Sequence, residues 1–392
     1  PGSVFSPYTS ITTNLLFFDN TKPTTETWFY RVDIPSDRKH FSKTKPMELK
    51  HFDDCITWWN NREIIPDGEY FKAQKYTADY LLNEQGCNID LCGYPHEEEE
   101  VLAPADLIQK YEEKRASLNA EIDRTILALS ASLNGEPVNF DTQGTISACG
   151  KMDDLHKRFP EDMKKSVLQY AIQGKLVEQR PEEGTAEELY RQIQTEKKRL
   201  TKEGKIKKEK PLPEIAEDEI PFDIPESWKW VRLGDCTGYS QTKPKISPKD
   251  ITENMWSLDL EDIQKESGAI LTRITASERK ITGDKVLFYK GQVLYSKLRP
   301  YLKKILVAPD NGICTPELVP FNTYLVYANY IVYVLRSPHI DYAVNSVTYG
   351  VKMPRVGTET MVNLLIPLPP IAEQKRIVAK LEEILPLCER LK

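Results

Sequence analysis

Regularly spaced apolar residues between positions 104 and 133 constrain the fold of this chain more than any other feature. They recur at steps of three, four and seven residues, which places them in one stripe along an α-helix. Pro104 suits the first turn of such a helix, and Asn134-Gly135 is a typical end. The stripe, which predicts one helix over 104–133, consists of Leu107, Tyr111, Leu118, Ile122, Ile126, Leu129 and Leu133.

The next segments combine an irregular stretch with two further helices. Residues 135–151 have no apolar period and are interpreted as a linker. A helix is expected from Pro160 to about Val177. Another is expected to start at Thr185, because Thr185 and Glu188 can each satisfy a free amide of the first turn. Gly204 is expected to end it.

Residues 225–366 have a different character, because helical spacing fades and short strand-like runs are divided by Gly and Pro. This pattern predicts a compact, β-rich α+β domain. The expected strands are Lys285–Tyr289, Gln292–Tyr295, Lys304–Ala308 and Tyr330–Leu335.

Residues 367–392 are expected to form a last helix, which follows the Pro367–Pro370 stop. Its apolar residues alternate in steps of four and three, which is a heptad seam and needs at least one partner helix. Pro386 predicts a kink or break. The seam consists of Ile377, Leu381, Ile384, Cys388 and Leu391.

The first 95 residues resemble the end of an α/β domain. Ser10–Phe18 and Thr27–Val32 are predicted strands, and Phe52–Asn60 is a predicted short helix. The strands have no visible partners, so we expect them to complete a sheet begun upstream. The chain starts without Met, and we expect it to be cut from a longer polypeptide. The predicted divisions are 1–95, 96–134, 135–151, 152–224, 225–366 and 367–392.

Charge is distributed unevenly along the chain, whose formal net charge is −6. Residues 225–366 hold 18 Lys and Arg against 14 Asp and Glu, a net charge of +4, so the rest carries −10. A basic module therefore lies within an acidic protein. The seven scattered cysteines lack a C-x-x-C pair and indicate a reduced, cytoplasmic protein. No apolar run is long enough to span a membrane.

The sequence lacks the motifs of the common catalytic sites. The sequence has no G-x-G loop, no G-K-[ST] loop, no Asn-Pro-Pro-aromatic tetrad and no recognisable histidine triad. Cys87, Cys92 and His96 lack the second ligand pair that a zinc site needs. We therefore predict no complete catalytic site, no metal and no cofactor in this chain. A self-sufficient nuclease or transferase is the less favoured alternative.

Three basic clusters in 225–366 remain as candidate chemistry. Lys and Arg supply phosphate contacts, Ser and Tyr supply neutral ones, and Arg can also recognise a guanine edge. Each cluster alone fits a solvated loop, but three in the one basic region favour DNA contact. The candidate residues are Lys243, Lys245, Ser296, Lys297, Arg299, Tyr301, Lys303, Lys304, Tyr349, Lys352 and Arg355.

A fourth basic run, from Lys197 to Lys210, contains eight basic and two acidic residues. We interpret it as a solvated helix end and linker, with phosphate contact as the alternative.

From Met152 onward the sequence resembles the specificity subunit of type I restriction–modification enzymes. The order and spacing of the matching stretches agree with the family as well as their residues do. The stretches are Leu168–Leu176, Pro221–Trp228, Leu294–Lys304, Gly350–Arg355 and Ile366–Val378. Residues 1–133 resemble the C-terminal end of the partner methyltransferase subunit, through Val4–Tyr8, Thr13–Phe18 and Trp28–Tyr30.

The resemblance implies a division of labour. Residues 225–366 would bind double-stranded DNA and recognise a few base pairs in the major groove. The helix after Ile371 would pair with its counterpart from a second recognition half, which fixes the spacing of half-sites. Only one recognition domain is present, so the second half would come from a second copy or from downstream sequence.

The same resemblance assigns the chemistry to another part of the system. Residues 1–133 would anchor the chain to an N6-adenine methyltransferase body that uses S-adenosylmethionine. A restriction or translocase subunit is a further partner of such systems. The rival interpretation is an assembly module that holds subunits together and recognises no DNA sequence.

Overall fold

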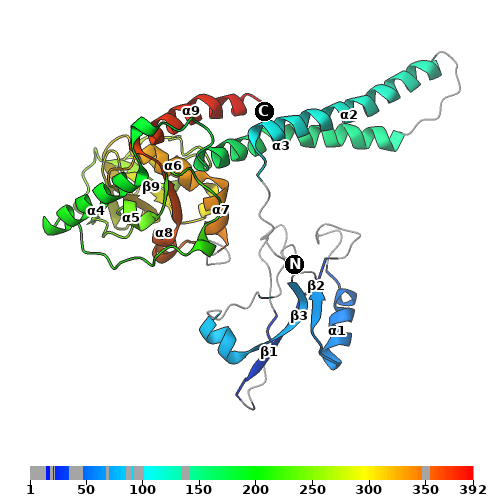
Figure 1. Ribbon diagram of the computed structural model, residues 1–392, viewed down its shortest axis with the longest axis horizontal. Helices are drawn as coiled ribbons and strands as arrows, with labels where there is room; N and C mark the ends of the chain where they lie inside the picture. Colours follow the sequence, from blue (N-terminus) through cyan, green and yellow to red (C-terminus); the bar gives the residue numbers. More distant parts are fainter. Residues whose placement is uncertain are drawn as a thin grey trace. The chain divides into compact units, whose positions relative to one another are not determined.

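The structure, a computed structural model, describes residues 15–17, 21, 23–34, 47–67, 70–84, 91, 101–133, 142–346 and 354–391. It divides into two compact units, Pro1–Glu99 and Glu100–Lys392, which are described separately (Figure 1). Among the described residues, no helix combines the length and apolar character needed to cross a membrane.

The first unit contains a small antiparallel sheet in the order β1-β3-β2. Trp58, which is 7% exposed, packs its ring on Trp28 and Tyr30 of the sheet. The predicted strand at 27–32 and the helix at 52–60 are confirmed. The elements are β1 (Glu26–Tyr30), η1 (Leu49–Phe52), α1 (Asp53–Asn60), β2 (Ile65–Asp67), β3 (Tyr70–Thr77) and η2 (Tyr80–Glu84).

The predicted strand Ser10–Phe18 falls mostly outside the described residues. Residues 15–17 are described, and they are exposed and not in a strand. The prediction was wrong there, because an apolar run alone does not supply the neighbouring strand that must satisfy its backbone groups.

The second unit begins with two long antiparallel helices, α2 (Pro104–Leu133) and α3 (Thr142–Ile172), which lie side by side (Figure 1). The rings of Tyr111 and Phe159 stack at 3.9 Å, and Leu118 packs with Met152 further along the pair. The predicted helix over 104–133 is confirmed.

The predicted linker is helical from Thr142 onward, and Pro160 lies inside α3, not at its start. The prediction was wrong because residues 142–151 are helical although no apolar period in their sequence marks a helix.

The described part of the β-rich region contains three sheets and supports the α+β prediction. Strands β5 (Lys245–Ile246), β6 (Trp256–Leu258), β7 (Ile274–Thr275), β8 (Lys285–Phe288) and β11 (Gly312–Cys314) form one, in the order β5-β8-β11-β6-β7. A second has the order β10-β9-β12, from β9 (Val293–Ser296), β10 (Ile305–Val307) and β12 (Leu318–Phe321). The third pairs β4 (Lys229–Arg232) with β13 (Leu365–Leu368). The first three predicted strands are confirmed as β8, β9 and β10.

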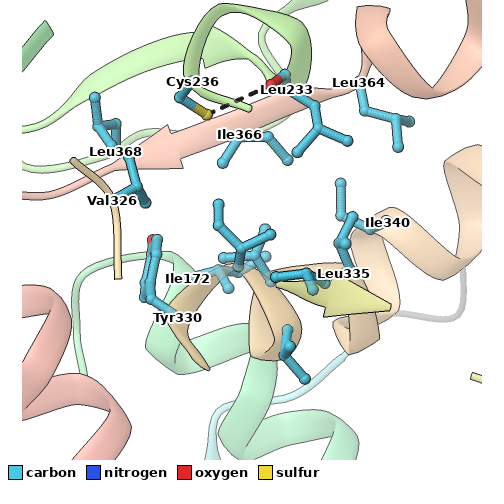
Figure 2. Packing of buried hydrophobic residues seen from close by; sticks show 14 of the residues in the cluster. Ile172, Leu233, Cys236, Val326, Tyr330, Leu335, Ile340, Leu364, Ile366 and Leu368 are labelled. Atoms are coloured by element: carbon cyan, nitrogen blue, oxygen red, sulfur yellow. Dashed lines mark hydrogen bonds between the residues drawn. The ribbon is translucent and has the colours of Figure 1, made fainter. Parts of the chain in front are cut away.

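The fourth predicted strand is wrong, because Tyr330–Leu335 lies in helix α6 (Ala328–Arg336). Figure 2 shows Tyr330 and Leu335 opposite Ile366 of β13, with Ile172 of α3 beside them. Five residues of α6 are buried, and this short run of aromatic and β-branched residues has the composition of a buried strand as much as that of a helix. Ser337-Pro338 then ends it, since the residue before proline disfavours helix.

The remaining elements frame this core. Helix α4 (Ala186–Lys202) starts at Thr185, whose hydroxyl accepts a hydrogen bond from the Glu188 amide at 3.4 Å, as predicted. Gly204 lies just beyond its end, with φ +70°. The other short elements are η3 (Pro181–Glu183), η4 (Glu217–Glu219), α5 (Leu233–Cys236), η5 (Leu260–Asp262), η6 (Pro300–Leu302), α7 (Pro338–Asn345) and α8 (Thr358–Asn363).

The last helix, α9 (Ile371–Glu389), continues through Pro386, so the predicted break is absent. Its seam residues Ile377, Leu381 and Cys388 are buried in the same core, and α9 packs on α3 and α6. The heptad seam therefore has its partner helices within this chain.

Candidate nucleic-acid interface

Two of the predicted basic clusters meet at one end of the β9–β12 strand pair. The Arg299 amide donates to the Pro354 carbonyl at 2.7 Å, and the Val356 amide donates to the Lys297 carbonyl at 3.1 Å. A further bridge joins Leu298 to Arg355. Clusters separated by about fifty residues in sequence thus form one surface. We call residues 297–304 the recognition loop.

A third segment, residues 264–268, completes this surface. The Glu266 amide donates to the Leu302 carbonyl at 2.9 Å. Arg336 of α6 donates to the carbonyl oxygens of Ser267 and Ile305, so it ties the segment to β10. Burial lowers the pKa of Arg336 to about 10, which leaves the guanidinium charged at neutral pH.

Backbone strain is concentrated in these loops. Four non-glycine residues among those described have positive φ, and three of them lie here: Glu266, Arg299 and Lys303. A left-handed conformation costs about 1–3 kcal/mol for such a residue, and it persists only where surrounding contacts impose it. Strain of this kind gathers at functional sites. The surrounding contacts therefore hold the backbone of these loops in a single conformation.

Three side chains at this surface remain available to contact a ligand, those of Lys297, Tyr301 and Lys265. Lys297 is half-buried with both backbone groups hydrogen-bonded, but its ammonium has no ion pair among the described residues. Tyr301 is 48% exposed. Lys265 is also exposed, and the contact between Glu266 and Leu302 brings it beside the loop.

Several predicted site residues are instead engaged by the fold. Ser296 is 3% exposed and donates to the Leu298 carbonyl at 2.8 Å. Lys304 donates to the Leu260 carbonyl at 2.6 Å, and Lys303 forms an ion pair with Asp341 at 2.9 Å. These side chains stabilise the loop, and sequence clustering alone could not separate them from Lys297.

Arg355 is also partnered, through a two-pronged ion pair with Glu317 at 2.9–3.3 Å. This pair lies where both clusters meet, because the Lys297 amide donates to the Glu317 carbonyl. Arg299 is held through its backbone, because its amide donates to the Pro354 carbonyl and its carbonyl accepts from the Leu302 amide. Tyr349 and Lys352 lie outside the described residues.

The third predicted cluster belongs to a different place in the fold. The Lys243 ammonium donates to the carbonyl oxygens of Gly238 and Tyr239, each at 2.8 Å. Burial lowers its pKa to about 8. Lys245 is exposed on β5. Lys243 is therefore structural, while Lys245 stays a candidate.

Sequence reasoning missed Lys265 and the glycine that shapes its turn. Gly268 has φ +63°, and a Cβ there would collide with the Ile305 carbonyl and with Arg336. Only glycine allows this approach. The Ser-Gly dipeptide signals a turn, but no local pattern places that turn against β10.

Among the described residues, no group of three His, Cys, Asp or Glu side chains is placed to hold a metal ion. Cys87, Cys92 and His96 lie outside them. Burial raises the pKa of Cys236 and of Cys314 to about 12, so these thiols are protonated at neutral pH.

The structure shows a β-rich domain that presents basic groups from strained loops, and comparison with known proteins shows what this domain resembles. Residues 225–389 match the family described as "Type I restriction modification DNA specificity domain". These residues are therefore similar to the type I restriction–modification specificity family.

Curated relatives of the same kind are similar as well. The chain is 29% identical over 239 residues to the specificity subunit of the type I restriction enzyme EcoAI of Escherichia coli, and 30% identical to that of EcoEI. Each match covers 58% of this chain and 40% of the relative. The chain is also 34% identical over 138 residues to the EcoEI methylase subunit, covering 34% of this chain and 28% of that subunit. It thus spans less than half the length of these relatives.

A solved structure is similar as well. The HsdS subunit from Thermoanaerobacter tengcongensis is 27% identical, with 44% of this chain and 45% of that chain covered and a TM-score of 0.38.

Proposed function

We propose that this chain recognises a DNA sequence for a type I restriction–modification system and leaves the chemistry to a partner. The match of residues 225–389 to a DNA specificity domain carries the proposal. The recognition loop and the neighbouring segment 264–268 support it physically. Lys297, Tyr301 and Lys265 offer cationic and aromatic groups from a backbone whose conformation is already fixed before DNA binds. Such preorganisation lowers the entropic cost of binding.

The chain would recognise one half of a bipartite target. Only one specificity domain is matched, over 225–389. A second half would come from another copy or from a longer polypeptide. Because the heptad seam of α9 is buried against α3 and α6 of the same chain, pairing with a second half would use other faces of these helices.

The chain would also dock to a methyltransferase. The likeness to a methylase subunit supports this, and matches of 239 and 138 residues can lie one after the other in a chain of 392. S-adenosylmethionine would bind to that partner and not to this chain. A restriction or translocase subunit would join the same assembly.

Selection from a randomised DNA duplex library tests recognition. The full chain is immobilised, bound duplexes are recovered at about 150 mM salt, and the enriched sequences are determined. We expect one short block of enriched bases. A pure assembly module would enrich no sequence, and that result would refute the proposal.

Transfer of labelled methyl groups tests the division of labour. The full chain incubated with S-adenosylmethionine and the recovered duplex should transfer no label. Transfer by the chain alone would show a complete active site within it.

A further inference from the structure

Five lysines at and beyond the end of α4 form a surface that the recognition loop does not include. Lys198 and Lys202 are one turn apart on α4, so they share a face. Lys207, Lys208 and Lys210 follow in an extended segment. All five are exposed, and within the described part of the chain none of their ammonium groups has an ion pair. We call these residues the lysine surface.

The acidic residues within this segment are neutralised by their neighbours. Arg199 binds Glu196 at 2.6 Å and Glu203 at 2.5 Å. Glu209 lies between Lys208 and Lys210 in the sequence, but its side chain points inward and forms an ion pair with Lys197 at 3.0 Å. The outward charge is therefore positive, although the segment holds three carboxylates.

Side-chain hydrogen bonds hold the extended segment in place. The Lys207 amide donates to the Gln241 side-chain carbonyl at 2.8 Å, and the Gln241 amide group donates back to the Lys207 carbonyl at 3.0 Å. Gln241 and Ser240 also donate to Glu209. The backbone that carries Lys207, Lys208 and Lys210 is therefore anchored to the β-rich domain. The backbone of a solvated linker would have no such anchor.

The anchor lies at the far end of the β9–β12 pair from the recognition loop. The Gly238 amide donates to the Asn322 carbonyl at 2.8 Å, next to Phe321, which pairs with Val293. The recognition loop leaves the other end, at Ser296. A four-residue strand separates the two ends by roughly 10 Å, or about three base-pair steps of a duplex.

We propose that the lysine surface binds the phosphates of the same DNA duplex, beside the bases that the recognition loop reads. This rests on the proposed function, since it assumes that a duplex is bound. Lysines contact phosphates as point charges and carry no base preference. The acidic residues Glu214, Glu217 and Asp218 lie just beyond Lys210 and would mark the edge of the contact.

A triple variant tests the proposal: Lys207→Gln, Lys208→Gln and Lys210→Gln in the full chain. The matched control carries Lys110→Gln, Lys114→Gln and Lys157→Gln, which are exposed lysines on α2 and α3. Both lose three charges. Binding to a long duplex is measured by fluorescence anisotropy over a series of salt concentrations.

We expect the triple variant to lower the salt slope by up to about 3, because each lost phosphate contact contributes about 0.9. The control should match the parent. Shortening the duplex on each side of the recognised block should remove the difference between parent and triple variant. A triple variant that matches the control on long duplexes would overturn the proposal and point to RNA or an acidic protein as the partner.

The same titrations separate this proposal from the proposed function. If the triple variant loses slope equally on the recovered duplex and on a scrambled one, the lysine surface binds phosphates whatever the loop recognises. If the parent shows no preference between these duplexes, sequence recognition fails on its own. Circular dichroism confirms that the variants are folded.

Discussion

Lys297 and Lys304 belong to one sequence cluster, and the structure predicts opposite consequences when each is replaced by Met. The Lys297 ammonium has no ion pair in the described part of the chain, so its loss should weaken DNA binding. The Lys304 ammonium donates to the Leu260 carbonyl at 2.6 Å, so its loss should weaken the fold.

The magnitudes follow from these contacts. Lys297→Met should lower the salt slope by about 0.9, so that between 50 and 200 mM salt the parent loses about 3.5-fold more affinity than the variant. Lys304→Met removes a hydrogen bond from a charged donor, and the Leu260 carbonyl keeps only the bond from the Ile263 amide at 3.3 Å. This should cost about 1.5–3 kcal/mol of unfolding free energy.

Two assays separate the outcomes. Anisotropy titrations across salt give the slope, and urea unfolding followed by circular dichroism gives the stability. The reasoning fails if Lys304→Met lowers the slope at unchanged stability, or if Lys297→Met destabilises the fold and keeps the parental slope.

Three further perturbations test the packing and electrostatics. Glu373→Ala leaves the buried Trp228 indole without its acceptor and should cost about 1–3 kcal/mol in urea unfolding, whereas exposed Glu382→Ala should change less than about 0.5 kcal/mol. The pKa of Lys243 is lowered to about 8, so the folded chain holds fewer protons than the unfolded chain above that pH. Stability should then rise from about pH 8 toward 10.5, and a flat profile would contradict this. Gly268→Ala should lower Tm, while Gly283→Ala, with open space at its Cβ, should not.

Elements with a clear local signal could be predicted from the sequence. The stripe from Leu107 to Leu133 predicts α2, and Thr185 predicts the start of α4, because period and capping are properties of neighbouring residues. Tyr330–Leu335 was mistaken for a strand because its aromatic and β-branched residues are typical of a buried strand. The first turns of α3 were missed because residues 142–151 carry no apolar period that marks a helix.

The candidate site was predictable only in part. The clusters at 295–304 and 348–355 were found from their composition, and the structure joins their described parts. Their composition does not reveal which cations are engaged, because Asp341, Leu260 and Glu317 come from other elements. Lys265 was missed for the same reason, since only the contact of Glu266 with Leu302 brings it to the loop.

Competition between two duplexes tests the central claim most directly. One duplex carries the base block recovered by selection, and the other carries the same bases in scrambled order. The full chain is titrated with both at about 150 mM salt. Each mismatched base pair costs about 1–3 kcal/mol, so three mismatches should weaken binding by at least about 100-fold. Equal affinity for the two duplexes would contradict sequence recognition by this chain.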